Sequence, residues 1–445
     1  MKFLLPQRSR TKQIIAISLP ILSGMISQNI LNLVDAAMVG HLGSAALGAV
    51  GMSSYMNFLF VALFMGLATG VQVMVARRLG EGRSERAAAP LNGSLLLNLL
   101  LAVPAAVILY FAAPSIINVL LDDPLVIDEA EIYLQMRVIG IWAIAMNFTF
   151  RGFWSGIKLT KYYMYVLVSM HAVNILLNYA LIYGNFGFPE MGVQGAGLGT
   201  SISMILGTIA HFILGLYKAR PYGFMENLPS IESLKSIIRL SIPNSLQQFF
   251  FAAGFSTLFW IISKVGTDAL AAANALTNIM LVAILPCIAF GISASTLVSE
   301  ALGKKDNEDA YQWGWDVTKL TIIALTLLAI VFILFAEPIL SVFLVELSAL
   351  QLAYWPMIIL ALMLPFEALG MVMMHALIGA GATSDSMKVS LSMQWLLFLP
   401  AVWLLGPVLG YGLAIIWLAQ AMYRSVQAII FTFMWRNKGW SDISV

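Results

Sequence analysis

The residues that could do chemistry in this sequence are a few polar side chains inside long apolar runs. Gln28, Asn32 and Asp35 stand at positions i, i+4 and i+7, which places them on one face of a helix. An ionised carboxylate inside a membrane span costs about 3 kcal/mol on insertion scales. Because proton binding removes that charge, Asp35 is a candidate proton carrier. The structural alternative is a hydrogen bond that joins two packed helices.

A second polar face lies further along the chain. Asn174 and Asn178 stand at positions i and i+4 inside another apolar run, so they also share one face of a helix. Two polar faces within one helical bundle are expected to point inward at each other, where they form a polar pocket. Each asparagine taken alone is equally explained by hydrogen bonding between helices.

The composition indicates a protein that lies mostly in lipid. Of its 445 residues, 60% are hydrophobic and only 10% are charged, and the mean hydropathy is +0.88. Soluble domains carry about 25% charged residues. The single cysteine, Cys287, excludes an internal disulfide, and the histidines show no metal-ligand spacing. We therefore predict an integral membrane protein that is not an enzyme and has no metal, no cofactor and no nucleic-acid partner.

Twelve apolar runs are long enough to cross a membrane, which takes about 20 residues each. Basic residues concentrate before the first run and in every second loop, so the positive-inside rule places both termini in the cytoplasm, with Lys264 as the main exception. The predicted spans are 14–40, 47–73, 92–112, 133–153, 163–184, 195–217, 238–262, 273–297, 319–336, 354–378, 388–406 and 410–434.

The two halves of the chain align at one constant offset. Pro20 then falls on Pro243, and Gly43 falls on Gly266. The repeat predicts an all-α fold of twelve transmembrane helices in two six-helix bundles, related by a pseudo-two-fold axis along the membrane normal. The predicted domains are an N-terminal bundle, a cytoplasmic linker and a C-terminal bundle, at residues 1–217, 218–237 and 238–445.

The repeat also acts as an internal control on the polar residues. Five polar side chains of the N-terminal half fall on apolar ones in the C-terminal half, so this polar set is not needed to build the helices. At the offset of 223 residues, Asp35 falls on Leu258, Asn32 on Phe255, Asn174 on Leu397 and Asn178 on Ala401, and after a gap of eight residues Thr200 falls on Ile415. Two-lobed repeats in membrane proteins indicate transport by alternating access, whereas the alternative is duplication for stability.

Two further residues inside the spans need interpretation. Pro20 lies in the same span as Asp35, nearer its start, and allows that span to bend, or else gives it a static kink. Glu367 falls on Ile144 in the repeat, so it is also confined to one half. It is either a second cation site or a protonated carboxyl in a helix contact. Arg137 is the one basic residue that we place inside a span.

Four segments carry a resemblance to a known family. They are LVDAAMVGHLG at 33–43 with ALGAVG at 46–51, the repeated ends RRLGEG at 77–82 and EALGKK at 300–305, and GVQGAGLGTSIS at 192–203. In this order, and with the repeat, the chain resembles the multidrug and toxic compound extrusion (MATE) transporters over essentially its full length. Within that family it looks like the prokaryotic DinF-like branch, which is regarded as proton-coupled.

The resemblance implies roles for individual residues. Asp35 matches the proton-binding aspartate, and its expected partners are Asn174, Asn178 and Thr200. Pro20 matches the proline at which the first span bends. Residues expected to contact substrate are Gln28, Asn32, Asn147, His171 and Met204. Some relatives carry an aspartate where Asn178 stands, so this pocket holds one carboxyl where those relatives have two.

We therefore expect a monomeric antiporter in the prokaryotic cytoplasmic membrane. It would export organic cations or amphipathic drugs in exchange for protons and contact membrane lipid. A sodium-coupled exporter that uses Glu367 is one alternative. A flippase for a lipid-linked substrate is another, although such proteins are expected to have a basic cavity. A membrane sensor is a third, but it would not explain the polar set confined to one half.

Overall fold

The computed structural model describes residues 6–121, 123–226 and 228–443. In these ranges the secondary structure is helical throughout, and eleven helices are long and apolar enough to cross a membrane. The predicted all-α membrane fold is thus confirmed. The axis that relates the two bundles stays a prediction.

The missing twelfth span is a broken helix. The predicted span 133–153 is divided between α4 (Pro124–Val138) and α5 (Ile141–Gly156), each too short to cross alone. The break has a local cause, because the hydroxyl of Ser201 donates to the carbonyl of Met136 at 2.6 Å and competes with the helix's own hydrogen bonds. Gly140 allows this approach, since a Cβ there would lie 2.8 Å from the same hydroxyl oxygen.

The helix lengths repeat at the offset found in the sequence. Helices α1 (Arg8–Gly40) and α8 (Ile231–Ser263) both have 33 residues, and α2 (Ser44–Gly80) and α9 (Thr267–Gly303) both have 37. The glycines that precede α2 and α9 both have positive φ angles, +117° at Gly43 and +156° at Gly266. A glycine is needed at both turns because a side chain would be strained there.

By internal packing the chain divides into two compact units. One unit comprises Pro20–Ser245, and the other comprises the chain up to Leu19 together with Leu246–Val445. We call them the N-unit and the C-unit. Their boundaries fall inside α1 and α8, after Leu19 and Ser245, whereas the domains predicted from the repeat divide the chain after residue 217 and, inside α8, after residue 237. The division at 217 and 238 stays a prediction about the repeat.

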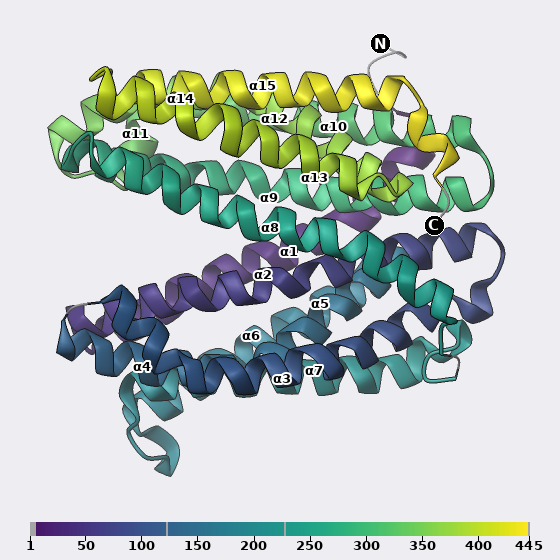
Figure 1. Ribbon diagram of the computed structural model, residues 1–445, viewed down its shortest axis with the longest axis horizontal. Coiled ribbons are helices and arrows are strands. Elements are labelled where there is room, and N and C mark those ends of the chain that lie inside the picture. The colour runs from purple at the N-terminus through teal and green to yellow at the C-terminus, as the bar shows by residue number, and fades with distance from the viewer. Residues whose placement is uncertain (1–5, 122, 227, 444–445) are drawn as a thin grey trace. The chain divides into compact units, whose positions relative to one another are not determined.

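In the N-unit, α2 packs along α4 and α5, and α6 packs along α7 (Figure 1). A short helical turn at Arg220–Tyr222 connects α7 to α8 and is fixed on the bundle, because Asn92 donates to the carbonyl of Gly223 at 3.0 Å. The remaining helices of this unit are α3 (Ala89–Leu120), α6 (Thr160–Tyr183) and α7 (Gly192–Lys218).

In the C-unit, α12 is the central helix and packs against α9, α10 and α15. The span that follows it contains two π-helical segments, at Ser392–Phe398 and Leu404–Val408, and Pro400 and Pro407 remove backbone donors in this region. The other helices are α10 (Asn307–Leu334), α11 (Ala336–Ser341), α12 (Leu347–Ala380), α13 (Thr383–Leu391), α14 (Leu399–Trp403) and α15 (Leu413–Arg436).

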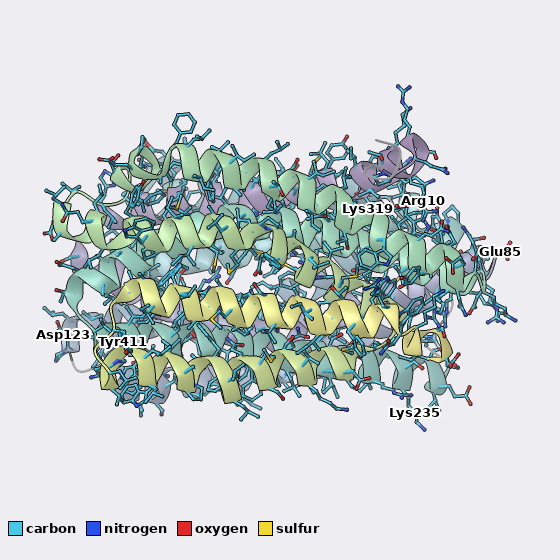
Figure 2. The ribbon with its side chains drawn as sticks, turned by 90° about the horizontal axis from the view of Figure 1, so that it is seen from above. Arg10, Glu85, Asp123, Lys235, Lys319 and Tyr411 are labelled. Atoms are coloured by element: carbon cyan, nitrogen blue, oxygen red, sulfur yellow. The ribbon has the colours of Figure 1, made fainter. Side chains whose placement is uncertain are left out.

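Each unit has two distinct ends. In the N-unit, Glu85 and Lys235 lie at one end and Asp123 at the other (Figure 2). In the C-unit, Arg10 and Lys319 lie at one end and Tyr411 at the other. The helices of each unit therefore run between two opposite ends of that unit.

Candidate functional site

Asp35 meets the asparagine face of α6. The Asn178 Nδ2 group donates to Asp35 Oδ1 at 2.9 Å and to Asn174 Oδ1 at 3.2 Å. Asn174 and Asn178 are buried, with 0% and 1% exposure, and Asp35 is half-buried. The structure thus brings together the two polar faces that helical spacing placed on α1 and α6.

The hydrogen bonds continue from α6 to α7. Asn174 Nδ2 donates to the hydroxyl of Ser203 at 3.1 Å, and that hydroxyl donates to the carbonyl of Thr200 at 2.7 Å. The hydroxyl of Thr200 donates to the carbonyl of Ala196 in its own helix. Thr200 therefore joins the network through its backbone, and Ser203, which the sequence analysis did not name, supplies the side chain. We call Asp35, Asn178, Asn174 and Ser203 the polar relay.

The close packing of α7 leaves one acceptor of the relay unused. Gly199 faces Asn178, and a Cβ at Gly199 would overlap Asn178 Oδ1. That oxygen is buried and has no hydrogen-bond partner in the part of the chain that the structure describes. This oxygen is therefore available to accept a hydrogen bond from a neighbouring group.

The charge of Asp35 is only weakly compensated. Arg137, on α4 just before the helix break, is the cation whose charge acts on Asp35. Among the described residues it forms no ion pair with Asp35, and its buried Nε atom has no hydrogen-bond partner. The group that hydrogen-bonds directly to the Asp35 carboxylate is thus the neutral amide of Asn178, and an added proton would not have to break an ion pair.

A second polar cluster lies nearer the middle of α1. His171 Nε2 contacts Gln28 Oε1 at 3.0 Å, and His171 Nδ1 contacts the hydroxyl of Ser27 at 2.8 Å. Gln28 Nε2 also donates to Asn32 Oδ1 at 3.2 Å, and Asn32 is exposed. Three of the five predicted substrate contacts therefore form one cluster, with Ser27 as an added member.

The other two predicted contacts form a separate cluster between α5 and α7. Asn147 Nδ2 donates to the carbonyl of Met204 at 3.0 Å, and Asn147 Oδ1 accepts from Thr208 at 3.1 Å. The sulfur of Met170, which precedes His171 in the chain, lies 3.8 Å from Asn147 Nδ2. The two clusters therefore contact consecutive residues of α6.

The sequence model of the MatE family matches this chain twice, over residues 20–180 and 243–404. The two matched stretches begin at Pro20 and Pro243, the same pair that the internal repeat aligns. The chain belongs to the MatE family. It is therefore a transporter of the MATE multidrug efflux family and not an enzyme, as the sequence predicts.

Full-length relatives agree with this assignment. A probable multidrug resistance protein NorM from Thermotoga maritima is 26% identical over 433 residues, covering 94% of this chain and 91% of the relative. A crystal structure of MATE in complex with MaL6 is 23% identical with a TM-score of 0.89, covering 96% of each chain. The outward-facing conformation of a multidrug resistance MATE family transporter is 22% identical with a TM-score of 0.89, covering 98% of this chain and 97% of that chain. Both structures have the same fold as this chain.

The MatE protein holds its other buried acid in the C-unit. Glu367 on α12 pairs with Arg424 on α15, with Arg424 Nη2 at 2.9 Å from Glu367 Oε1, and their side chains are 4% and 12% exposed. The prediction that Arg137 is the one basic residue inside a span is wrong, because Arg424 lies midway along α15, the last span. Arg424 also donates to Gln427 Oε1 at 3.0 Å.

A small pocket adjoins this ion pair in the C-unit. The guanidinium of Arg424 also faces the rings of Phe251 and Tyr423, at 5.8 and 5.5 Å from their centroids. Glu367 thus lies in a helix contact in which the guanidinium of Arg424 faces its carboxyl group. The pocket is lined by Phe366, Glu367, Gly370, Met371, Met374, Arg424, Gln427 and Phe431.

Pro20, the predicted hinge, lies inside α1 at the first residue of the N-unit. It separates the start of α1 from the part that carries Gln28 and Asp35.

Helical spacing could also have indicated Ser203, which stands at position i+3 from Thr200. No comparable signal relates Glu367 to Arg424, because those residues lie on different helices of the MatE protein.

Proposed function

We propose that the chain exports cationic or amphipathic organic compounds from the cytoplasm in exchange for protons, with Asp35 as the proton-binding group. The observation that carries the proposal is the unused acceptor beside Asp35. Asn178 donates to the carboxylate through Nδ2, while its own buried oxygen has no partner among the described residues.

Protonation would reverse the polarity of this contact. A carboxylate only accepts hydrogen bonds, whereas a carboxylic acid also donates one. A protonated Asp35 would donate to Asn178 Oδ1, and the amide of Asn178 would turn to receive it. The hydrogen bond between Asn178 and Asn174 would then reverse, with Asn174 as the donor, and the bond between Asn174 and Ser203 would reverse in turn, with Ser203 as the donor. A single proton would thereby change contacts on α1, α6 and α7.

The ionised form of Asp35 would be the form that binds a cationic substrate. An ionised Asp35 favours a cationic substrate, and the cluster of Gln28, Asn32 and His171 supplies further polar contacts on α1 and α6. A proton on Asp35 removes that attraction. Transport requires that the proton favour one conformation over the other, because a ligand shifts an equilibrium only by its differential affinity. Bending of α1 at Pro20 would change the shape of the cluster and release the substrate outward.

The proposal also includes the oligomeric state, the membrane and the coupling ion. The protein would work as a monomer in the prokaryotic cytoplasmic membrane, with both termini in the cytoplasm. Sodium coupling through Glu367 is less favoured, because the Arg424 guanidinium already provides the cation at that carboxylate. The proposal therefore keeps coupling at Asp35.

The experiment is efflux of ethidium, a planar organic cation, from proteoliposomes under an imposed pH gradient or an imposed sodium gradient. The wild type should respond to the pH gradient, and Asp35→Asn should lose that response. Asp128→Asn is the matched control, since Asp128 is a carboxylate of the same unit outside the polar relay. Unchanged pH-driven efflux in Asp35→Asn would overturn the proposal, as would efflux driven by sodium alone.

A further inference from the structure

The helices that open the two repeats are each divided between the compact units. The start of α1 packs with the C-unit up to Leu19, and α1 belongs to the N-unit from Pro20 onward. The start of α8 belongs to the N-unit up to Ser245 and the remainder to the C-unit. Both divisions lie close to a proline inside the helix, Pro20 or Pro243.

Arg10 joins the start of α1 to α10. Arg10 Nη1 donates to Asp309 Oδ1 at 2.7 Å, and Arg10 Nε lies 2.7 Å from Asp316 Oδ2. The guanidinium also lies over the ring of Trp313, 3.7 Å from its centroid, and Trp313 Nε1 donates to Asp309 Oδ2 at 2.9 Å. We call these four residues the Arg10 clamp.

The geometry of the clamp favours a fixed attachment. Asp309, Trp313 and Asp316 occupy positions i, i+4 and i+7 of α10, so they present one continuous face to Arg10. The side chains of Arg10 and Asp316 are only 16% and 15% exposed, which limits screening by solvent. Charge-assisted bonds and stacking on an indole act on the same guanidinium.

The equivalent attachment of α8 in the N-unit has different chemistry. At the offset of the repeat, Arg10 falls on Ser233 and Asp316 falls on Gly93. A Cβ at Gly93 would overlap Pro229, and Ser241 lies directly against two glycines of α2, Gly66 and Gly70. The start of α8 is therefore attached by the packing of small residues and by a hydrogen bond from Arg78 Nη2 to Ser233 Oγ at 2.9 Å, and the uncharged Ser233 forms no ion pair. The clamp occurs on the helix that carries Asp35.

We propose that Arg10 is a positioning residue for transport. It holds the start of α1 on α10 throughout the cycle, so that a change at Asp35 moves the rest of α1 about Pro20 against a fixed end. The polar relay then acts on the C-unit through the continuous helix α1. This inference rests on the proposed proton coupling at Asp35 and adds the attachment through which that coupling is transmitted.

Replacement of Arg10 should separate binding from transport. In Arg10→Ala, pH-driven efflux of ethidium should fall about tenfold, within the range typical of coupling between distant sites. Binding of ethidium, and the protons released when it binds, should stay at the wild-type level. Arg8→Ala is the control, because Arg8 is an exposed arginine in the first turn of the same helix. Unchanged efflux in Arg10→Ala would overturn the inference.

A covalent bridge tests whether the attachment stays closed. Arg10→Cys and Asp316→Cys are combined with Cys287→Ala, so that the two new thiols are the only ones in the chain. Efflux should be reduced before cross-linking and restored by a short bismaleimide about as long as an arginine side chain. A bridge that leaves efflux low, or lowers it further, would contradict a fixed attachment.

The proposed proton coupling and the proposed role of the Arg10 clamp can be disproved by different results. A wild-type protein that shows no pH-driven efflux and no proton release would overturn the proposed function itself. Normal proton coupling in the wild type, together with full efflux in Arg10→Ala, would overturn only the role of the Arg10 clamp.

Discussion

Asp35 in the N-unit and Glu367 in the C-unit are two acids with opposite surroundings. Asp35 contacts the neutral amide of Asn178 on α6, whereas Glu367 contacts a guanidinium on α15. Both replace an apolar residue of the other repeat, Leu258 or Ile144, so neither is required to form its helix. The difference lies in whether the negative charge is already compensated by the protein.

The comparison separates an exchangeable charge from a fixed one. A buried ion pair resists the loss of either partner, because the remaining charge would be left without compensation. Glu367 and Arg424 therefore stabilise the C-unit as a pair. Asp35 has no such partner among the described residues, and a proton or a cationic substrate can supply the missing charge. In the proposed function, the N-unit is therefore the half of the molecule that responds to protons.

The largest expected effect comes from breaking the fixed pair. Arg424→Gln leaves Glu367 uncompensated and should lower the free energy of unfolding by about 3 to 5 kcal/mol. Thermal unfolding in detergent measures the change. The double variant Glu367→Gln with Arg424→Gln should recover most of the stability, because no buried charge remains. Equal losses in the single and double variants would contradict an ion pair whose members compensate each other.

The next effect comes from the donor beside Asp35. Asn178→Leu removes the hydrogen bonds to Asp35 and Asn174, and bonds to charged groups contribute about 1.5 to 3 kcal/mol. We expect pH-driven efflux of ethidium to fall about tenfold or more. Asn98→Leu is the control, since Asn98 is a buried asparagine of the same unit that bonds to Thr149 at 2.7 Å. If both variants lose efflux equally per folded molecule, the relay has no special role.

The smallest expected effect comes from crowding the relay without removing any of its groups. Gly199→Ala places a methyl group against Asn178 Oδ1 and should cost about 1 to 3 kcal/mol of stability, with a partial loss of coupled efflux. Gly48→Ala is matched to it, because a Cβ at Gly48 meets no atom within 4 Å. Similar stability and efflux in the two alanine variants would show that α7 does not restrain Asn178.

Much of the architecture could be predicted from the sequence because it follows from hydropathy and periodicity. Apolar runs indicated the spans, and helical spacing placed Asp35 and Asn178 on facing polar surfaces. The break at Gly140 could not be predicted, since its cause is the hydroxyl of Ser201 on another helix. The pairing of Glu367 with Arg424 was missed for the same reason, because contacts between helices distant in sequence leave no periodic signal.

The most direct test of the account is the release of protons when ethidium is added to the purified protein in a weakly buffered detergent solution. Wild type and the double variant Glu367→Gln with Arg424→Gln should release protons to the same extent, because Asp35 is intact in both and neither holds an unpaired buried charge. Asp35→Asn should release none while remaining folded. Release that persists in Asp35→Asn, or that is lost in the folded double variant, would contradict the assignment of the exchangeable charge to the N-unit.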